Sequence, residues 1–171
     1  MTIRNEASHV PPVPMRPAHD PEVALAARTD ACILLTGQPD AARELAYRLH
    51  LSSAWRHGPF TVIDCASADP RLEAHVFATL FPSDAPAEPD VMQLRLVQAG
   101  TVLLEEINRL PLAAQDRLAG RLSDLRAQMP RSRRRLIASS SEPLFDRVRN
   151  GTFDDGLYYR LNVMQLMAVG S

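Results

Sequence analysis

Short apolar runs alternate with helical patterns along this chain, and this alternation constrains its fold more than any other feature. Most of the runs are apolar throughout, which is typical of strands that are covered on both faces. Since helical patterns separate each run from the next, the sequence predicts an α/β fold, a parallel sheet with helices on each side. The predicted strands are residues 31–37, 60–66, 100–107, 133–141 and 163–169.

Helix signals lie between the predicted strands. Pro21 fits the first turn of a helix, and Asp69 followed by Pro70 is typical of a helix cap and a first helical position. Gly100 ends a further helical stretch. The predicted helices are residues 21–29, 40–54, 69–81, 91–99, 111–129, 142–149 and 156–162, and residues 82–90 are predicted to form a loop.

Residues 1–20 differ in composition from the rest of the chain. They contain "HVPPVPMRPAHDP", which is rich in proline and has no periodicity. We therefore predict a disordered, Pro-rich arm at 1–20 and a single folded domain at 21–171. A polyproline II segment that docks on a partner is the alternative interpretation of the arm.

The overall composition excludes several classes of function. A net charge of −1 gives no general attraction to nucleic acid or to an acidic surface. No apolar run is long enough to span a membrane, and the N-terminus has no signal-peptide pattern, so we expect a cytoplasmic protein without membrane contact. Cys32 and Cys65 lie in apolar runs without metal-ligand spacing and are interpreted as small core residues.

The stretch "LLTGQPDAAREL", residues 34–45, has the outline of a phosphate-binding loop: an apolar strand, a glycine, a short turn and a helix. Ligands of parallel α/β sheets bind beyond the carboxyl ends of the strands, where we also expect Glu105–Glu106 and Ser139–Ser141. The lysine that such a loop uses is missing, because all 19 basic residues are arginines.

Four segments resemble the central AAA+ domain of bacterial sigma-54-dependent transcription activators. They are "ILLTGQPDAARELAYRLHLSS", "PFTVIDCAS", "AGTVLLEEINRLPLAAQDRL" and "GTFDDGLYYRLNV", in the family's order. The resemblance covers residues 21–167 and implies a P-loop NTPase-like (AAA+) fold with a five-stranded parallel sheet. It also implies ring assembly, ATP hydrolysis and remodelling of sigma-54 RNA polymerase, each of which depends on particular residues.

The phosphate loop departs from the family's GESGTGKE pattern. Gly37 matches the first glycine, but Pro39 has no N–H, Asp40 and Ala42 replace glycines, and Arg43 replaces the lysine. A carboxylate about 4 Å from a phosphate oxygen is opposed by roughly 4 kcal/mol at an effective dielectric of about 20. We therefore favour a plain strand-to-helix connection, with Asp40 capping a helix that begins near Ala41, over retained nucleotide binding. The degenerate loop comprises Gly37, Gln38, Asp40, Ala42, Arg43 and Glu44.

The other family motifs are partly intact. The resemblance gives Glu105 the place of a carboxylate that helps hold magnesium, and Glu106 the place of the carboxylate that polarises the attacking water. Ser140 and Ser141 stand where the family senses the γ-phosphate. Arg160 matches one of two arginines that reach a neighbouring subunit's nucleotide, and Asp154 reverses the charge of the other. Arg160 is interpreted either as a trans-acting arginine or, slightly preferred, as a salt-bridge partner.

Other family features are absent from the sequence. No GAFTGA loop, which grips sigma-54, occurs between residues 81 and 99, so sigma-54 contact is not expected. A run of arginines is interpreted as a solvated edge, with contact to nucleic acid as the weaker alternative. These arginines are Arg131, Arg133, Arg134 and Arg135. No helical lid follows the fifth strand within this sequence; the chain lacks the lid or is part of a longer protein.

These observations predict a regulator that acts through protein–protein interaction and not through ATP-driven remodelling. The expected partner is an AAA+ activator, or a second copy that binds through the inter-subunit face near Arg160. No cofactor and no direct DNA binding are expected. The alternative is a weak ATP-binding or ATPase module that uses Mg²⁺ with Arg43, Glu105 and Glu106.

Overall fold

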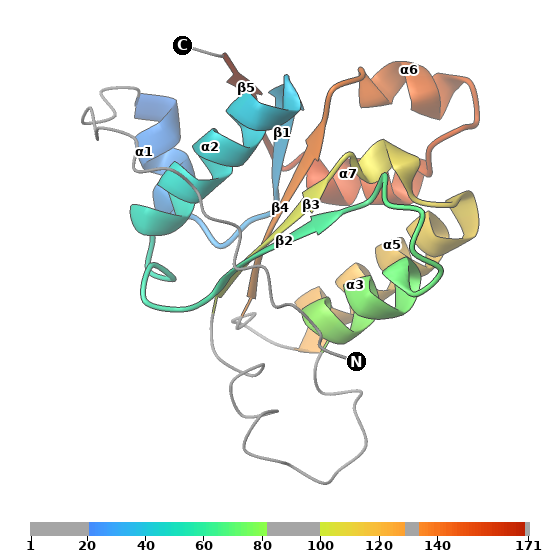
Figure 1. Cartoon of the computed structure of the whole chain (residues 1–171), viewed down its shortest axis with the longest axis horizontal. Coiled ribbons are helices and arrows are strands. Elements are labelled where there is room, and N and C mark those ends of the chain that lie inside the picture. The colour runs from blue at the N-terminus through green and yellow to red at the C-terminus, as the bar shows by residue number, and fades with distance from the viewer. Residues whose placement is uncertain (1–20, 82–99, 129–133, 170–171) are drawn as a thin grey trace, which may run out of the picture.

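A computed structural model of the chain describes residues 21–81, 100–128 and 134–169. Five parallel strands form one sheet in the order β2-β3-β4-β1-β5 (Figure 1). The predicted five-stranded parallel sheet is therefore confirmed. The strands are β1 (Ile33–Gly37), β2 (Phe60–Asp64), β3 (Gly100–Glu105), β4 (Arg134–Ser140) and β5 (Met164–Ala168).

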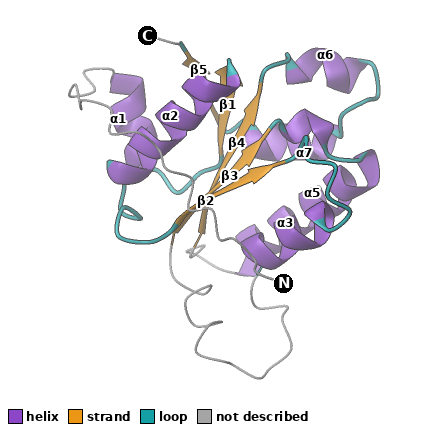
Figure 2. Ribbon diagram, viewed as in Figure 1, coloured by secondary structure: helices purple, strands orange, loops and turns teal. Residues whose placement is uncertain are grey.

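Helices cover both faces of this sheet (Figure 2). Side chains alternate between the two faces of a strand, so neighbouring residues of β1 belong to different cores. Leu35 packs in the cluster formed with α1 and α2, whereas Leu34 packs in the cluster formed with α3, α5 and α7. The helical elements are α1 (Pro21–Arg28), α2 (Pro39–Leu51), α3 (Leu72–Leu80), the 3-10 turn η2 (Ile107–Arg109), α5 (Leu112–Gln128), α6 (Leu144–Arg149) and α7 (Asp155–Leu161). None of the helices among the described residues is both long and apolar enough to cross a membrane.

Two predicted helix starts were wrong. The helix predicted from Asp69 begins at Leu72, because the Asp69 carboxylate accepts the N–H of Arg71 and holds a turn before the helix. The helix predicted from Glu142 begins at Leu144, since the N–H of Glu142 donates to the Ser140 hydroxyl instead. The predicted arm 1–20, loop 82–90 and helix 91–99 lie outside the described residues.

The prediction of a solvated arginine edge was wrong for Arg134 and Arg135, which are only 7% and 1% exposed in β4. Arg131 and Arg133 lie outside the described residues. Burial lowers the pKa of Arg135 to about 10. The sequence could not reveal this burial, because a run of like charges is usually solvated.

Arg135 is held by two helix ends. Its Nη1 donates to the carbonyl of Leu49 at 3.3 Å, and its Nη2 donates to the carbonyl of Ala26. These carbonyls lie in the last turns of α2 and α1, where carbonyls lack helical partners and the helix dipole favours a cation. The guanidinium also lies 5.5 Å from the ring centre of Trp55. Arg135 thus joins α1 and α2 to the sheet.

A buried histidine makes stability depend on pH. His50 is 3% exposed, and its Nδ1 lies 2.9 Å from the Thr101 hydroxyl. Burial, and then the charge of Arg135, lower the pKa of His50 below its ordinary value of 6.5. As the pH falls below 6.5, the unfolded chain takes up this proton before the folded chain does, so the free energy of unfolding decreases.

We expect urea unfolding to show a constant free energy near pH 7 to 8 and a decrease of up to about 1.4 kcal/mol per pH unit between about pH 6.5 and 5. His50→Gln is expected to abolish this slope. His75→Gln, at an exposed position, is expected to keep it. Equal slopes in the two variants would contradict the assignment to His50.

Candidate functional site

Three of the segments singled out in the sequence meet at one edge of the sheet. Leu35 pairs with Ser139, and Leu104 pairs with Ala138, so the carboxyl ends of β1, β4 and β3 lie side by side. The Gly37–Glu44 segment, the Glu105–Glu106 pair and the Ser139–Ser141 segment all follow from these ends. The structure therefore brings them into one site.

The turn between β1 and α2 is short. Gly37 has φ of +134°, and a Cβ at this position would overlap the carbonyl oxygen of Ala168 in β5. Only glycine suits this backbone, whether or not a phosphate is bound. Helix α2 begins at Pro39, with Gln38 as its N-cap. A phosphate loop keeps this segment open so that its N–H groups can surround phosphates. In this chain most of the segment is helical instead.

The predicted role of Asp40 as a helix cap was wrong. Helix α2 starts before Asp40, the Gln38 N-cap makes no side-chain capping bond, and Asp40 is an exposed residue of the first turn. Its carboxylate is favourable there because the helix N-terminus is electropositive. Ala42 is buried in the core, and Glu44 is half-buried one residue beyond Arg43.

Arg43 and Glu105 form a bidentate ion pair. The Nε of Arg43 donates to Oε1 of Glu105 at 2.6 Å, and Nη2 donates to Oε2 at 2.5 Å. Glu105 is 4% exposed, whereas the side chain of Arg43 is 43% exposed. The hydrogen bond to Glu105 is the main reason why the pKa of Arg43 is raised. Both oxygens of the carboxylate expected to help hold magnesium are thus bound to the arginine that replaces the lysine.

The surroundings of this pair are acidic. Asp40 and Asp64 add to the raised pKa of Arg43. Nearby, the pKa of the Cys65 thiol is raised to about 12, mainly by burial and in smaller part by the charges of Asp64, Glu105 and Glu106. Cys65 is 2% exposed and packs in the core, and the field at this edge of the sheet is negative. Among the described residues, no group of three or more His, Cys, Asp or Glu side chains is placed to hold a metal ion.

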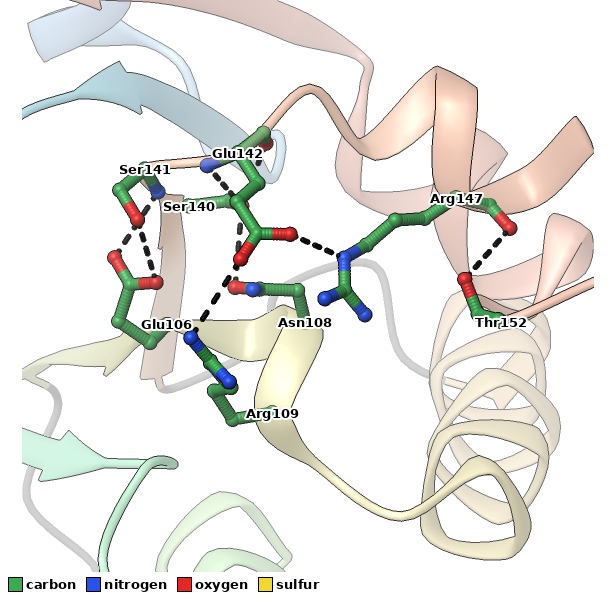
Figure 3. Close-up of polar contacts among 8 residues, drawn as sticks. All are labelled: Glu106, Asn108, Arg109, Ser140, Ser141, Glu142, Arg147 and Thr152. Atoms are coloured by element: carbon green, nitrogen blue, oxygen red, sulfur yellow. Dashed lines mark hydrogen bonds and ion pairs between the residues drawn. The ribbon is translucent and has the colours of Figure 1, made fainter. Parts of the chain in front are cut away.

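Glu106 has a strained backbone and a fixed carboxylate. Its φ and ψ are both 50°, in the left-handed region that residues other than glycine rarely adopt. Its Oε1 accepts the N–H of Ser141 at 3.0 Å, and its Oε2 accepts the Ser141 hydroxyl at 2.9 Å (Figure 3). Two of the predicted site residues therefore contact each other directly.

A polar network that the sequence did not predict surrounds these residues (Figure 3). The hydroxyl of Ser140 lies 3.1 Å from Oδ1 of Asn108. The carboxylate of Glu142 accepts from Nε of Arg147 at 2.6 Å and pairs with Nη2 of Arg109 at 3.5 Å. The bond from Arg147 is the main reason why the pKa of Glu142 is lowered. The network ties η2 to β4 and α6, and only the polar character of these residues could have pointed to it.

The sequence slightly favoured a salt-bridge role for Arg160, but among the described side chains Arg160 forms no salt bridge. Its Nε donates to the Ser123 hydroxyl at 2.5 Å, and its Nη1 donates to the Gly156 carbonyl at 2.6 Å.

The reversed charge at Asp154 has a local role. The Asp154 carboxylate accepts the N–H of Leu157 at 2.6 Å as the N-cap of α7. An arginine could not accept this bond, so the substitution suits the helix start.

A pocket of about 680 Å³ lies beside Glu106. Neither Arg43 nor Glu105 lines it, so it is separate from the loop between β1 and α2. The lining residues are Cys65, Ala66, Ser67, Ala68, Asp69, Pro70, Leu72, Glu73, Glu106, Arg109, Leu110 and Pro111.

Comparisons with known proteins agree on one family. A family model described as the sigma-54 interaction domain matches residues 18–167. The chain is 32% identical over 169 residues to the response regulator protein FleR of Pseudomonas aeruginosa, with 91% of this chain and 35% of FleR covered. It is 32% identical over 149 residues to the transcriptional regulator NtrC of Rhizobium meliloti, with 81% and 31% covered. The chain thus spans about a third of the length of these relatives.

Solved structures show the same fold. NtrX from Brucella abortus has a TM-score of 0.69 at 25% identity, with 92% of this chain and 38% of NtrX covered. NtrX in complex with ATP has a TM-score of 0.67 at 26% identity, with 86% and 35% covered. The P-loop NTPase domain of the sigma-54 transport activator from E. coli has a TM-score of 0.63 at 19% identity, with 88% and 91% covered. This last likeness concerns the fold alone.

Proposed function

The chain belongs to the sigma-54 interaction domain family, and we propose that it is a non-catalytic member that modulates transcription by binding a protein partner. The observation that carries this proposal is the Arg43–Glu105 ion pair. Arg43, which stands where the family has its lysine, donates two hydrogen bonds to the buried carboxylate of Glu105, at 2.6 and 2.5 Å. To bind a nucleotide with magnesium, the site would have to break this pair.

The residues at the site do not fit Mg²⁺-ATP. Pro39 offers no N–H, and the N–H of Ala42 already donates to the Gln38 carbonyl at 2.9 Å because α2 begins at Pro39. Asp40 places a carboxylate on the approach of the phosphates, and Asp64 adds to the negative field. Both oxygens of Glu105 already accept hydrogen bonds from Arg43, whose positive charge opposes a metal ion at the same carboxylate. These features support a site that has lost its nucleotide, and we derive no hydrolytic step from it.

A protein partner is favoured over nucleic acid. Two arginines of the basic run, Arg134 and Arg135, are buried in β4 and cannot contact phosphates. The α6–α7 face near Arg160 exposes aromatic side chains, with Phe145 at 52% and Tyr159 at 67%. Exposed aromatic residues are enriched at protein interfaces. We therefore place the contact with an AAA+ activator, or with another protein partner, on this face.

The experiment that tests this proposal is a titration of the chain with a fluorescent ATP analogue and magnesium. We expect no saturable binding up to about 1 mM, a limit that corresponds to roughly 4 kcal/mol of binding free energy. NtrX, which has been crystallised with ATP, serves as the positive control. Micromolar binding by the native chain would overturn the proposal and favour the alternative, a weak ATP-binding module.

A further inference from the structure

Three aromatic side chains form a contiguous group on α6 and α7, here called the aromatic row. The ring of Tyr158 contacts both others, with its centre 6.1 Å from that of Phe145 and 5.4 Å from that of Tyr159. Tyr158 is half-buried, and its hydroxyl accepts from Nδ2 of Asn162 at 2.9 Å. Phe145 is 52% exposed and Tyr159 is 67% exposed. The row therefore presents two exposed rings on either side of an anchored one.

The charges beside the aromatic row differ between its two ends. At one end, the exposed Asp155 lies one helical turn before Tyr159 on α7. The neighbouring Arg160 does not balance this carboxylate, because its guanidinium donates to two acceptors on α5 and α7. At the other end, Asp146 and Arg149 of α6 are both exposed and offset each other. The row therefore favours a ligand with a positive charge at the end that meets Asp155.

Residues 11–17 of this chain, which read "PPVPMRP", have the matching pattern. Proline fixes φ near −65° and favours the polyproline II conformation, which has three residues per turn. In that conformation Pro11, Pro14 and Pro17 share one face at intervals of about 9 Å, so two of them can each contact one exposed ring of the row. Arg16 adds a positive charge close to these prolines. Proline-rich segments dock on aromatic surfaces because their conformation is restricted before they bind.

We propose that residues 11–17 of a second copy of this chain dock on the aromatic row. Two prolines of the segment cover the exposed rings, and Arg16 pairs with Asp155. This inference rests on the proposed use of the α6–α7 face as a protein contact, and it names the chemistry of the partner: a proline-rich segment that carries an arginine. Each copy has both the segment and the row, so the chain associates with itself.

The segment of the same molecule is too short to reach the row. Pro17 is four residues before Pro21, where α1 begins, and an extended chain covers at most about 14 Å over this length. Helix α1 packs in the core cluster on one face of the sheet, whereas α6 and α7 pack in the cluster on the other face. Adjacent layers of helix and sheet lie about 10 Å apart, so two such spacings exceed the reach of the linker.

Sedimentation velocity of the 171-residue chain between about 1 and 300 µM tests the docking. We expect reversible self-association of the native chain. Tyr159→Ser removes one exposed ring, and Pro14→Ala removes one proline of the segment; each is expected to weaken association at least about fivefold. Leu112→Ser is the matched control, since Leu112 is 50% exposed on α5 and lies outside the row, and it is expected to leave association unchanged.

An exchange of charges tests the pairing of Arg16 with Asp155. Arg16→Asp and Asp155→Arg are each expected to weaken association about tenfold, because each brings like charges together. The double variant is expected to regain the native affinity to within about threefold. Thermal unfolding of every variant is compared with that of the native chain, so that a folding defect is not counted as lost docking.

Two kinds of result would overturn the proposal. One is a native chain that stays monomeric at about 300 µM, whether the aromatic row then binds a different protein or the segment of its own chain. The other is self-association that Tyr159→Ser leaves intact or that the double charge exchange does not restore. These measurements contain no nucleotide, so either result refutes the docking and leaves the proposed loss of nucleotide binding standing. Micromolar ATP binding in the fluorescent titration would do the reverse.

Discussion

Restoring the phosphate loop is expected to raise the affinity of the chain for nucleotide, which we propose is negligible in the native sequence. The variant combines Pro39→Ser, Asp40→Gly, Ala42→Gly and Arg43→Lys. Removal of the Asp40 carboxylate alone relieves roughly 4 kcal/mol of repulsion if it lies about 4 Å from a phosphate oxygen. The two glycines and the serine let the start of α2 open into a loop. We expect ATP affinity to rise by on the order of a thousandfold, from undetectable to micromolar.

The reason lies in the geometry of the native turn. Helix α2 begins at Pro39 and Arg43 is bound to Glu105, so the four substitutions act on both obstacles at once. The measurement is the same fluorescent titration, with magnesium present and absent. Asp155→Gly is the matched control, because it removes an exposed carboxylate from the first turn of a different helix. If the restored variant binds no ATP analogue while its thermal unfolding matches that of the native chain, these four positions do not account for the absence of binding.

The strands and their parallel order follow from local pattern, which explains why the sequence predicts them. The run 100–105 has the apolar centre Val102–Leu104, and in the structure all six residues of β3 are buried. A strand of this kind suits only a sheet that is covered on both faces. Helix starts were predicted less well. At Asp69 and Glu142, side-chain to backbone bonds hold turns that compete with the first helical turn.

The pairing of charges could not be predicted from the sequence. Arg43 and Glu105 are 62 residues apart, and each has several other charged residues nearer in the chain. Arg135 lies in a run of arginines, and a run of this kind predicts a solvated side chain. Its partner, the carbonyl of Ala26, is 109 residues away in the sequence. Such contacts depend on how β4 packs against the ends of α1 and α2. Neither spacing nor composition contains this information.

Arg135→Ala is expected to be the most destabilising single substitution considered for this chain, at about 3–4 kcal/mol. Each hydrogen bond from a charged donor contributes roughly 1.5–3 kcal/mol, and Arg135 donates to both Ala26 and Leu49. The substitution also leaves a cavity in a position that is 1% exposed. The desolvation cost of a buried cation offsets part of this loss. Urea unfolding at pH 7.5, where His50 is neutral in both states, is the measurement.

Two further variants separate the charge of Arg135 from its size. Arg135→Met also removes the cation but fills much of the same volume, so we expect it to cost about half as much as Arg135→Ala, which leaves a cavity. Arg149→Ala removes an exposed arginine at the end of α6 and is expected to change stability by less than about 0.5 kcal/mol. If Arg135→Ala unfolds at the same urea concentration as Arg149→Ala, the two helix ends do not depend on this guanidinium. The joining of α1 and α2 to the sheet must then come from apolar contacts alone.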